Sequence, residues 1–109
     1  MAALANERSA NTFKQALTDE DREVRIVAGD GFAKIADGSA IDAMLKAADC
    51  EPGWERIQQT KSCMVLAEKL AADGKKGDSA KIYQHLQKTR RDASEQYIRE
   101  MAEAALSST

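Results

Sequence analysis

A nine-residue pattern that occurs twice constrains this chain more than any other feature of its sequence. Val-Arg-x-x-Ala-x-x-x-Phe over residues 24–32 returns as Ile-Arg-x-x-Ala-x-x-x-Leu over residues 98–106, at an offset of 74 residues. Because this offset is twice 37, a third copy should lie midway. There the run 32–38 has a counterpart in residues 67–74, with one residue inserted. A period of about 36–38 residues predicts units of two helices that bury their wide apolar faces by stacking on one another.

Composition and hydrophobic periodicity predict a chain made only of helices, because helix-favouring residues are abundant and proline and β-branched residues are scarce. The expected helices cover about residues 3–17, 20–36, 39–48, 52–72, 78–88 and 92–107. They form a single domain over residues 1–109 that consists of a lead-in helix over 3–17, repeats over 19–49 and 52–89, and a partial repeat over 92–107. The connections are short, so consecutive helices should run antiparallel.

Capping residues and a proline predict where three of these helices begin. Thr18-Asp19 is an N-cap for the second helix, and Pro52 is tolerated in the first turn of the fourth. Asp78 or Ser79 caps the fifth. The apolar stripes of the helices predict the following buried residues: Phe32, Ile35, Leu45, Met64, Leu70, Ile82, Leu86 and Ile98.

Residues 24–31 admit a second interpretation, as a strand that ends in a phosphate-binding glycine turn. A parallel sheet needs several more strands, and no other segment alternates polar and apolar residues with a period of two. We therefore expect a helix here. Gly29 and Gly31 cost such a helix about 1 kcal/mol each relative to alanine, so they should mark places where a neighbouring helix packs closely.

Residues 19–45 resemble a bacterial HEAT repeat. The matching residues are Asp-Glu-Asp-Arg-Glu-Val-Arg over 19–25, then Ala28, Phe32 and Ile35, then Asp-Gly-x-Ala-Ile-x-x-Met-Leu over 37–45. This resemblance implies a right-handed α-solenoid of about three antiparallel helix pairs, with five to six helices in all. It also implies a non-enzymatic scaffold that binds another protein, although such repeats serve unrelated functions.

The resemblance implies structural roles for two arginines. In HEAT repeats an Asp before the first helix and an Arg within it tie one repeat to the next. Here these roles would fall on Asp19 or Asp21, and on Arg25 and Arg99. We expect each guanidinium to reach a carboxylate or helix-end carbonyls of the preceding unit, with Asp92 as a further candidate acid.

The middle helix pair departs from the HEAT pattern. Leu-Ala-Glu-Lys-Leu-Ala-Ala-Asp-Gly over residues 66–74, followed by Ala-x-Ile-Tyr-x-x-Leu over 80–86, is closer to a tetratricopeptide repeat. Together the two resemblances cover residues 18–106, and both motifs are degenerate.

Net charge argues against a general nucleic-acid binder, because the chain carries −2 and such proteins normally carry a basic excess. Residues 75–91 nevertheless hold six basic side chains against Asp78 as the single acid. A solvated helix face explains such a run, and an acidic partner is the alternative. A nucleic-acid-binding helical repeat that uses residues 75–91 is thus a second functional hypothesis.

Residues that support catalysis or metal binding are not grouped in this sequence, so we expect no enzyme, no cofactor and no metal site. His85 has no Cys, Asp or Glu at ligand spacing along its helix, which favours an exposed surface histidine. Cys50 and Cys63 are too few for a disulfide framework, and Cys63 fits a core position. Trp54 is interpreted as clasping two helices, with a binding aromatic as the alternative.

The second helix of each pair is expected to form the partner-binding surface. The candidate residues are Asp42, Lys46, Lys81, Gln84, His85 and Lys88. The uncapped helix over 92–107 suggests either a domain of a longer protein or a homodimer formed through this helix. With no membrane span or signal peptide in the sequence, a cytoplasmic location is expected if Met1 is the native start.

Overall fold

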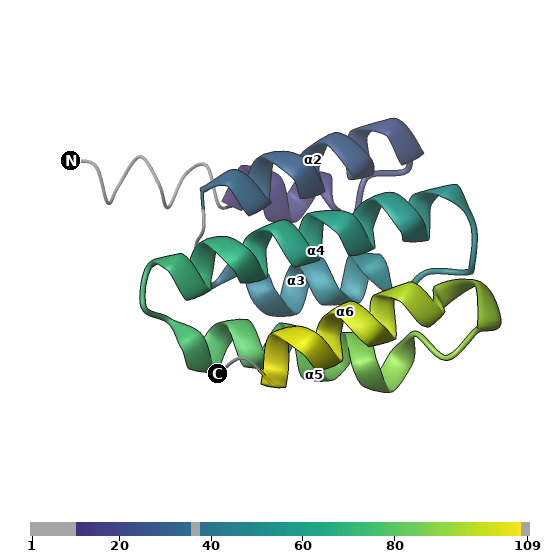
Figure 1. Cartoon of the computed structure of the whole chain (residues 1–109). Helices are drawn as coiled ribbons and strands as arrows, with labels where there is room; N and C mark the ends of the chain where they lie inside the picture. Colours follow the sequence, from purple (N-terminus) through teal and green to yellow (C-terminus); the bar gives the residue numbers. More distant parts are fainter. Residues whose placement is uncertain (1–10, 36–37, 108–109) are drawn as a thin grey trace.

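The structure is a computed structural model that describes residues 11–35 and 38–107. This part of the chain consists of helices joined by short turns (Figure 1). Residues 11–16 are helical and precede the labelled elements. These elements are α2 (Arg22–Lys34), α3 (Ala40–Ala48), α4 (Trp54–Ala72), α5 (Lys76–Thr89), the 3-10 turn η1 (Ala93–Glu95) and α6 (Gln96–Ser107). The described residues include no strand, so the all-α prediction is confirmed and the glycine-turn alternative over 24–31 is wrong.

Asp21, and not the predicted Thr18-Asp19, caps α2. The Asp21 side chain accepts a hydrogen bond from the Glu23 amide at 2.9 Å, while Asp19 accepts from the Asp21 amide at 2.8 Å. The acids therefore act in succession: Asp19 fixes the turn, and Asp21 satisfies a free N–H of the first helical turn. The predicted end of this helix at residue 36 lies outside the described residues.

The predicted starts of α4 and α5 were also wrong by two or three residues. Pro52 lies in the turn before α4, and the adjacent Gly53 adopts φ 153°, a conformation that favours glycine. α5 begins earlier than expected, at Lys76. Between them, Gly74 has φ 81° and ends α4 as predicted: its amide donates to Ala71 O, and the next amide donates to Leu70 O at 2.8 Å.

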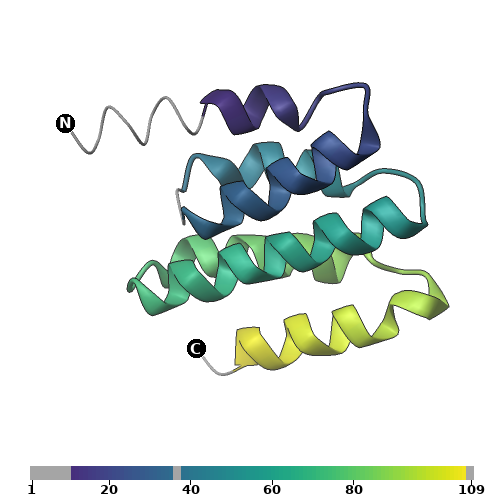
Figure 2. The ribbon, with the colours of Figure 1, turned by 90° about the horizontal axis from the view of Figure 1, so that it is seen from above.

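The helices lie in two rows, which Figures 1 and 2 show from two directions. The first row contains α2, α4 and α6; the second contains residues 11–16, α3 and α5. α4 is the central helix and packs on α2, α3 and α5. α6 packs on α5 and stands apart from α4, with no Cα of one helix within 8 Å of a Cα of the other.

The predicted core residues are buried, with one exception. Phe32, Leu70, Ile82 and Leu86 are fully inaccessible to solvent, while Ile35, at the end of α2, is only half-buried. The core extends beyond the prediction through small and aliphatic residues that include Ala40, Met44, Ala48, Cys63, Leu66, Ala67 and Ala102. Among the described residues, no helix is long and apolar enough to cross a membrane.

Both glycines of α2 allow a neighbouring helix to approach, as predicted. A Cβ at Gly31 would lie 2.7 Å from Cε1 of Phe13, whose ring stacks on Phe32 with centroids 5.8 Å apart. A Cβ at Gly29 would overlap the side chain of Gln59 on α4. That amide donates a hydrogen bond to Arg25 O at 2.8 Å, so the missing side chain gives α4 a direct contact with the α2 backbone.

Candidate interaction surfaces and the arginine network

The six predicted partner-binding residues lie on α3 and α5, in the second row. The structure brings two of them together, because Lys81 Nζ and Asp42 Oδ1 form an ion pair at 3.3 Å across the two helices. Both side chains are well exposed. Lys46 lines a groove of about 370 Å³ that lies between α3 and the end of the first described helix. Gln84 and Lys88 are exposed.

His85 is not the exposed surface histidine expected from the sequence. It is half-buried, and its Nε2 lies 2.7 Å from Oδ2 of Asp49 at the end of α3. Burial works against ionisation of Asp49, but hydrogen bonds from Arg90 and His85 outweigh it and lower the pKa of this carboxyl. The sequence shows no acid near His85 along α5, and the structure supplies one from the end of α3, Asp49.

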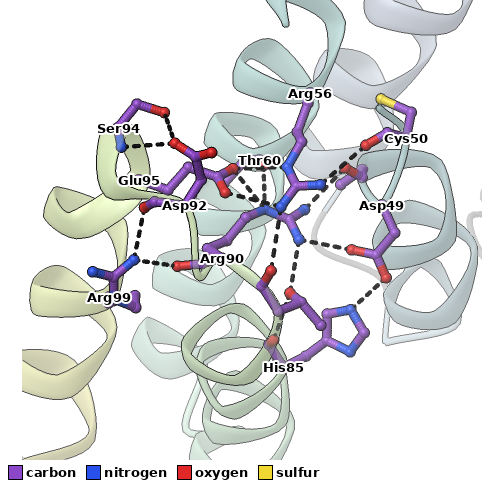
Figure 3. Close-up of polar contacts among 12 residues, drawn as sticks. Asp49, Cys50, Arg56, Thr60, His85, Arg90, Asp92, Ser94, Glu95 and Arg99 are labelled. Atoms are coloured by element: carbon purple, nitrogen blue, oxygen red, sulfur yellow. Dashed lines mark hydrogen bonds and ion pairs between the residues drawn. The ribbon is translucent and has the colours of Figure 1, made fainter. Parts of the chain in front are cut away.

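Arg90 joins α3, α4 and α5 in the centre of a buried polar network (Figure 3). Its side chain is completely inaccessible to solvent. Nη1 donates to Asp49 Oδ1 at 2.8 Å and to Thr89 Oγ1 at 2.7 Å. Nη2 donates to Ala48 O at 2.9 Å, and Nε to Thr60 Oγ1 at 3.1 Å. A buried charge is tolerated when it is paired and hydrogen-bonded in this way.

Arg56 extends the network from α4 to the start of α6. Its Nε and Nη2 form a bidentate pair with Glu95, the residue before α6, at 2.7 and 2.9 Å. Nη1 also donates to Cys50 O and Nη2 to Thr89 O. Glu95 lies 3.8 Å from Nε of Arg90, so one carboxylate balances two guanidinium groups.

Arg25 makes the same kind of contact one helix earlier. Its Nε and Nη2 bind both oxygens of Glu55, the second residue of α4, at 2.6 and 2.7 Å. Nη1 donates to Asp19 O and Glu20 O in the loop before α2. The carboxylate therefore belongs to α4, the next helix of the first row, and not, as expected, to the preceding unit. Its hydrogen bond raises the pKa of Arg25 and lowers that of Glu55.

Arg99 on α6 repeats the loop contacts of Arg25. Its Nη1 donates to Arg90 O at 2.7 Å and to Asp92 O at 2.8 Å. Asp92 contributes only its backbone here, because its side chain accepts from the amide and hydroxyl of Ser94, which lower its pKa. Both arginines from the repeated pattern thus bind backbone carbonyls of the loop that leads into their own helix.

The two cysteine thiols near these polar groups are held in the neutral form. Burial and the nearby Glu55 raise the pKa of the Cys50 thiol, and burial raises that of Cys63 to about 12, so neither favours the reactive thiolate. Among residues 11–35 and 38–107 no three His, Cys, Asp or Glu side chains are grouped to hold a metal ion. The chemistry that the network supports is the fixing of loops and helix ends.

Exposed apolar side chains distinguish the first row from the second. In the described chain, the large hydrophobic residues that remain exposed are Val24 and Val27 on α2, Trp54, Ile57 and Val65 on α4, and Tyr97 and Met101 on α6. None lies on α3 or α5. Trp54 is 59% exposed, so the interpretation that it clasps two helices is wrong. A groove of about 400 Å³ lies between α2 and α4 and includes Val27 and Val65.

Sequence reasoning missed both the network around Arg90 and the apolar surface of the first row. Arg90 looked like one more member of the basic run over 75–91.

Comparison of the chain with protein-family models, curated proteins and solved structures gives no match.

Proposed function

We propose that this protein is a non-enzymatic scaffold that binds another protein, and that its two rows of helices form a HEAT-like α-solenoid. The repeated pattern and the alternation of helices between rows support the solenoid. The loop contacts that Arg25 and Arg99 share support a common repeat unit.

The distribution of exposed apolar residues carries the proposal and moves the partner surface to the first row. Trp54, Ile57, Val65, Tyr97 and Met101 expose large side chains on α4 and α6. Aromatic residues and methionine are enriched at interfaces, and an apolar surface shared by neighbouring helices marks an interaction site. The α3–α5 face instead presents charged residues that partly satisfy one another, such as Asp42 and Lys81.

The burial of Arg90 weakens the nucleic-acid hypothesis. Solvent cannot reach Arg90, which is one of the six basic residues of the segment over 75–91, and Lys81 is paired with Asp42. Sequence-independent binding to phosphates depends on the number of available cations, and this surface offers fewer free cations than the sequence of residues 75–91 indicates.

Two double variants separate the two faces. Tyr97→Glu with Met101→Glu adds two negative charges to the first row, and Gln84→Glu with Lys88→Gln makes the same change of net charge on the second row. Each variant is first checked for helical content and thermal stability. Proteins captured by the wild type from the source cell extract are then purified, and their dissociation constants are measured with each variant.

We expect the first-row variant to weaken binding at least about tenfold, because a buried charge at an interface is costly, and the second-row variant to bind normally. The reverse result would assign binding to the face predicted from the sequence. Equal binding by both variants would contradict both surfaces. Binding to homopolymeric RNA that falls steeply with salt would instead favour the nucleic-acid hypothesis.

A further inference from the structure

Arg25 and Arg56 use the nitrogen atoms of their guanidinium groups in the same way. In each, Nη1 donates to backbone carbonyls of the loop before its own helix. In each, Nε and Nη2 form a fork that binds both oxygens of a glutamate beside the start of the next first-row helix: Glu55 is the second residue of α4, and Glu95 immediately precedes α6. The arginine of one unit thus holds the acid of the next.

Arg99 has the first half of this arrangement without the second. Its Nη1 is held by Arg90 O and Asp92 O. Its Nε and Nη2 find no acceptor in the described chain, where α6 is the last helix of the first row. A guanidinium fixed by two carbonyls is oriented before any partner arrives, so little side-chain entropy remains to be lost when a carboxylate binds the fork.

The opposite end of the first row has a complementary surface. An apolar groove of about 340 Å³ lies between the first described helix and α2, and its lining includes Phe13, Ala16, Val24 and Val27. Glu23 lies at this groove and is the second residue of α2, as Glu55 is of α4. No residue that the structure describes forms an ion pair with the exposed Glu23 carboxylate.

We propose that copies of this chain stack head to tail, with α6 of one copy beside α2 of the next and the Arg99 fork on Glu23. The described chain begins with a second-row helix and ends with a first-row helix, so a second copy continues the alternation of rows without a break. The contact uses two different surfaces, one from each end, so assembly can continue past two copies and stops only where the stack closes into a ring. The stacking contact shares α6 with the proposed partner surface, but it is argued from Arg99 and Glu23, which are not part of that surface.

Charge reversal at the two ends tests this contact. Sedimentation velocity over a hundredfold range of concentration is measured for the wild type, for Arg99→Glu, for Glu23→Arg and for an equimolar mixture of the two variants. Controls are Arg91→Glu and Glu20→Arg, which change the same charges at exposed neighbouring positions. Circular dichroism confirms folding. Because Arg99 also binds loop carbonyls, Glu23→Arg is the decisive variant should Arg99→Glu unfold.

The wild type is expected to gain mass continuously with concentration. Each single variant places like charges at the contact and should associate at least about tenfold more weakly, while the controls behave as wild type. The mixture should restore assembly, because both of its contacts are again between opposite charges. A wild type that stays monomeric, a mass that stops at two copies, or a Glu23→Arg variant that associates normally would each overturn the proposal.

Discussion

Replacing Arg90 with methionine tests whether the buried network holds α3, α4 and α5 together. Methionine keeps much of the apolar volume but removes every donor, which leaves Ala48 O and the Asp49 carboxylate without their principal partner. Thr60 can rebond within its own helix, and Asp49 is partly reached by water, since it is 34% exposed. Removing one partner of a buried pair typically costs about 3–5 kcal/mol, and we expect a loss in this range.

The loss is measured by urea unfolding followed by far-UV circular dichroism, with the slope of the transition as a check that both states are unchanged. Arg91→Met is the control, because the adjacent Arg91 is exposed and makes one long hydrogen bond, 3.4 Å, to Gln87 O. Its effect should stay within about 0.5 kcal/mol. A loss below about 1 kcal/mol for Arg90→Met would refute the structural role of the network.

Three further changes test the packing and the ion pairs. Leu70→Ala or Leu86→Ala should each cost about 2–5 kcal/mol in urea unfolding, and losses below about 1 kcal/mol at both would mean that the core is misassigned. Gly29→Ala should cost about 1–3 kcal/mol, since the new Cβ overlaps the buried Gln59 side chain, whereas Gly77→Ala, with open space around it, should not destabilise the fold. The lowered pKa values of Asp49 and Glu55 mean that their stabilisation is present above about pH 4 and is lost as pH falls further. The melting temperature should therefore drop below about pH 4, with a shallower drop in Asp49→Asn; a drop that begins near neutral pH would contradict this assignment.

Features that depend on local periodicity could be predicted from the sequence. The apolar stripes located the helices and most of the core, because residues three and four apart share a helix face. Gly29 and Gly31 were interpretable because a glycine inside a helix needs a reason, and close helix packing is a common one. Helix starts were less accurate, since Asp19 and Asp21 can both act as caps and only three-dimensional geometry selects between them.

Features that depend on distant partners could not be predicted. Arg90 binds Asp49 and Ala48, which precede it by 41 and 42 residues, and nothing around Arg90 distinguishes it from the exposed Arg91. Likewise, Trp54 and Met101 lie on helices that bury their opposite faces, and the exposure of these two side chains depends on how the rows stack. That exposure is decided by the position of α6 relative to α4, which a single sequence does not determine.

The arginine contacts lie along one edge of the molecule. Hydrogen bonds at this edge and apolar burial in the core therefore have different roles. Arg25, Arg56 and Arg99 each bind carbonyls of a loop that leads from a second-row helix into a first-row helix, and these loops gather on the same side in Figure 1. Apolar burial is non-directional and supplies most of the stability, whereas bidentate hydrogen bonds fix angles. The spacing between successive first-row helices is therefore constrained along this edge, where the Arg56–Glu95 pair bridges two helices, α4 and α6, that have no Cα atoms within 8 Å of each other. A scaffold whose partner surface spans α4 and α6 depends on that spacing.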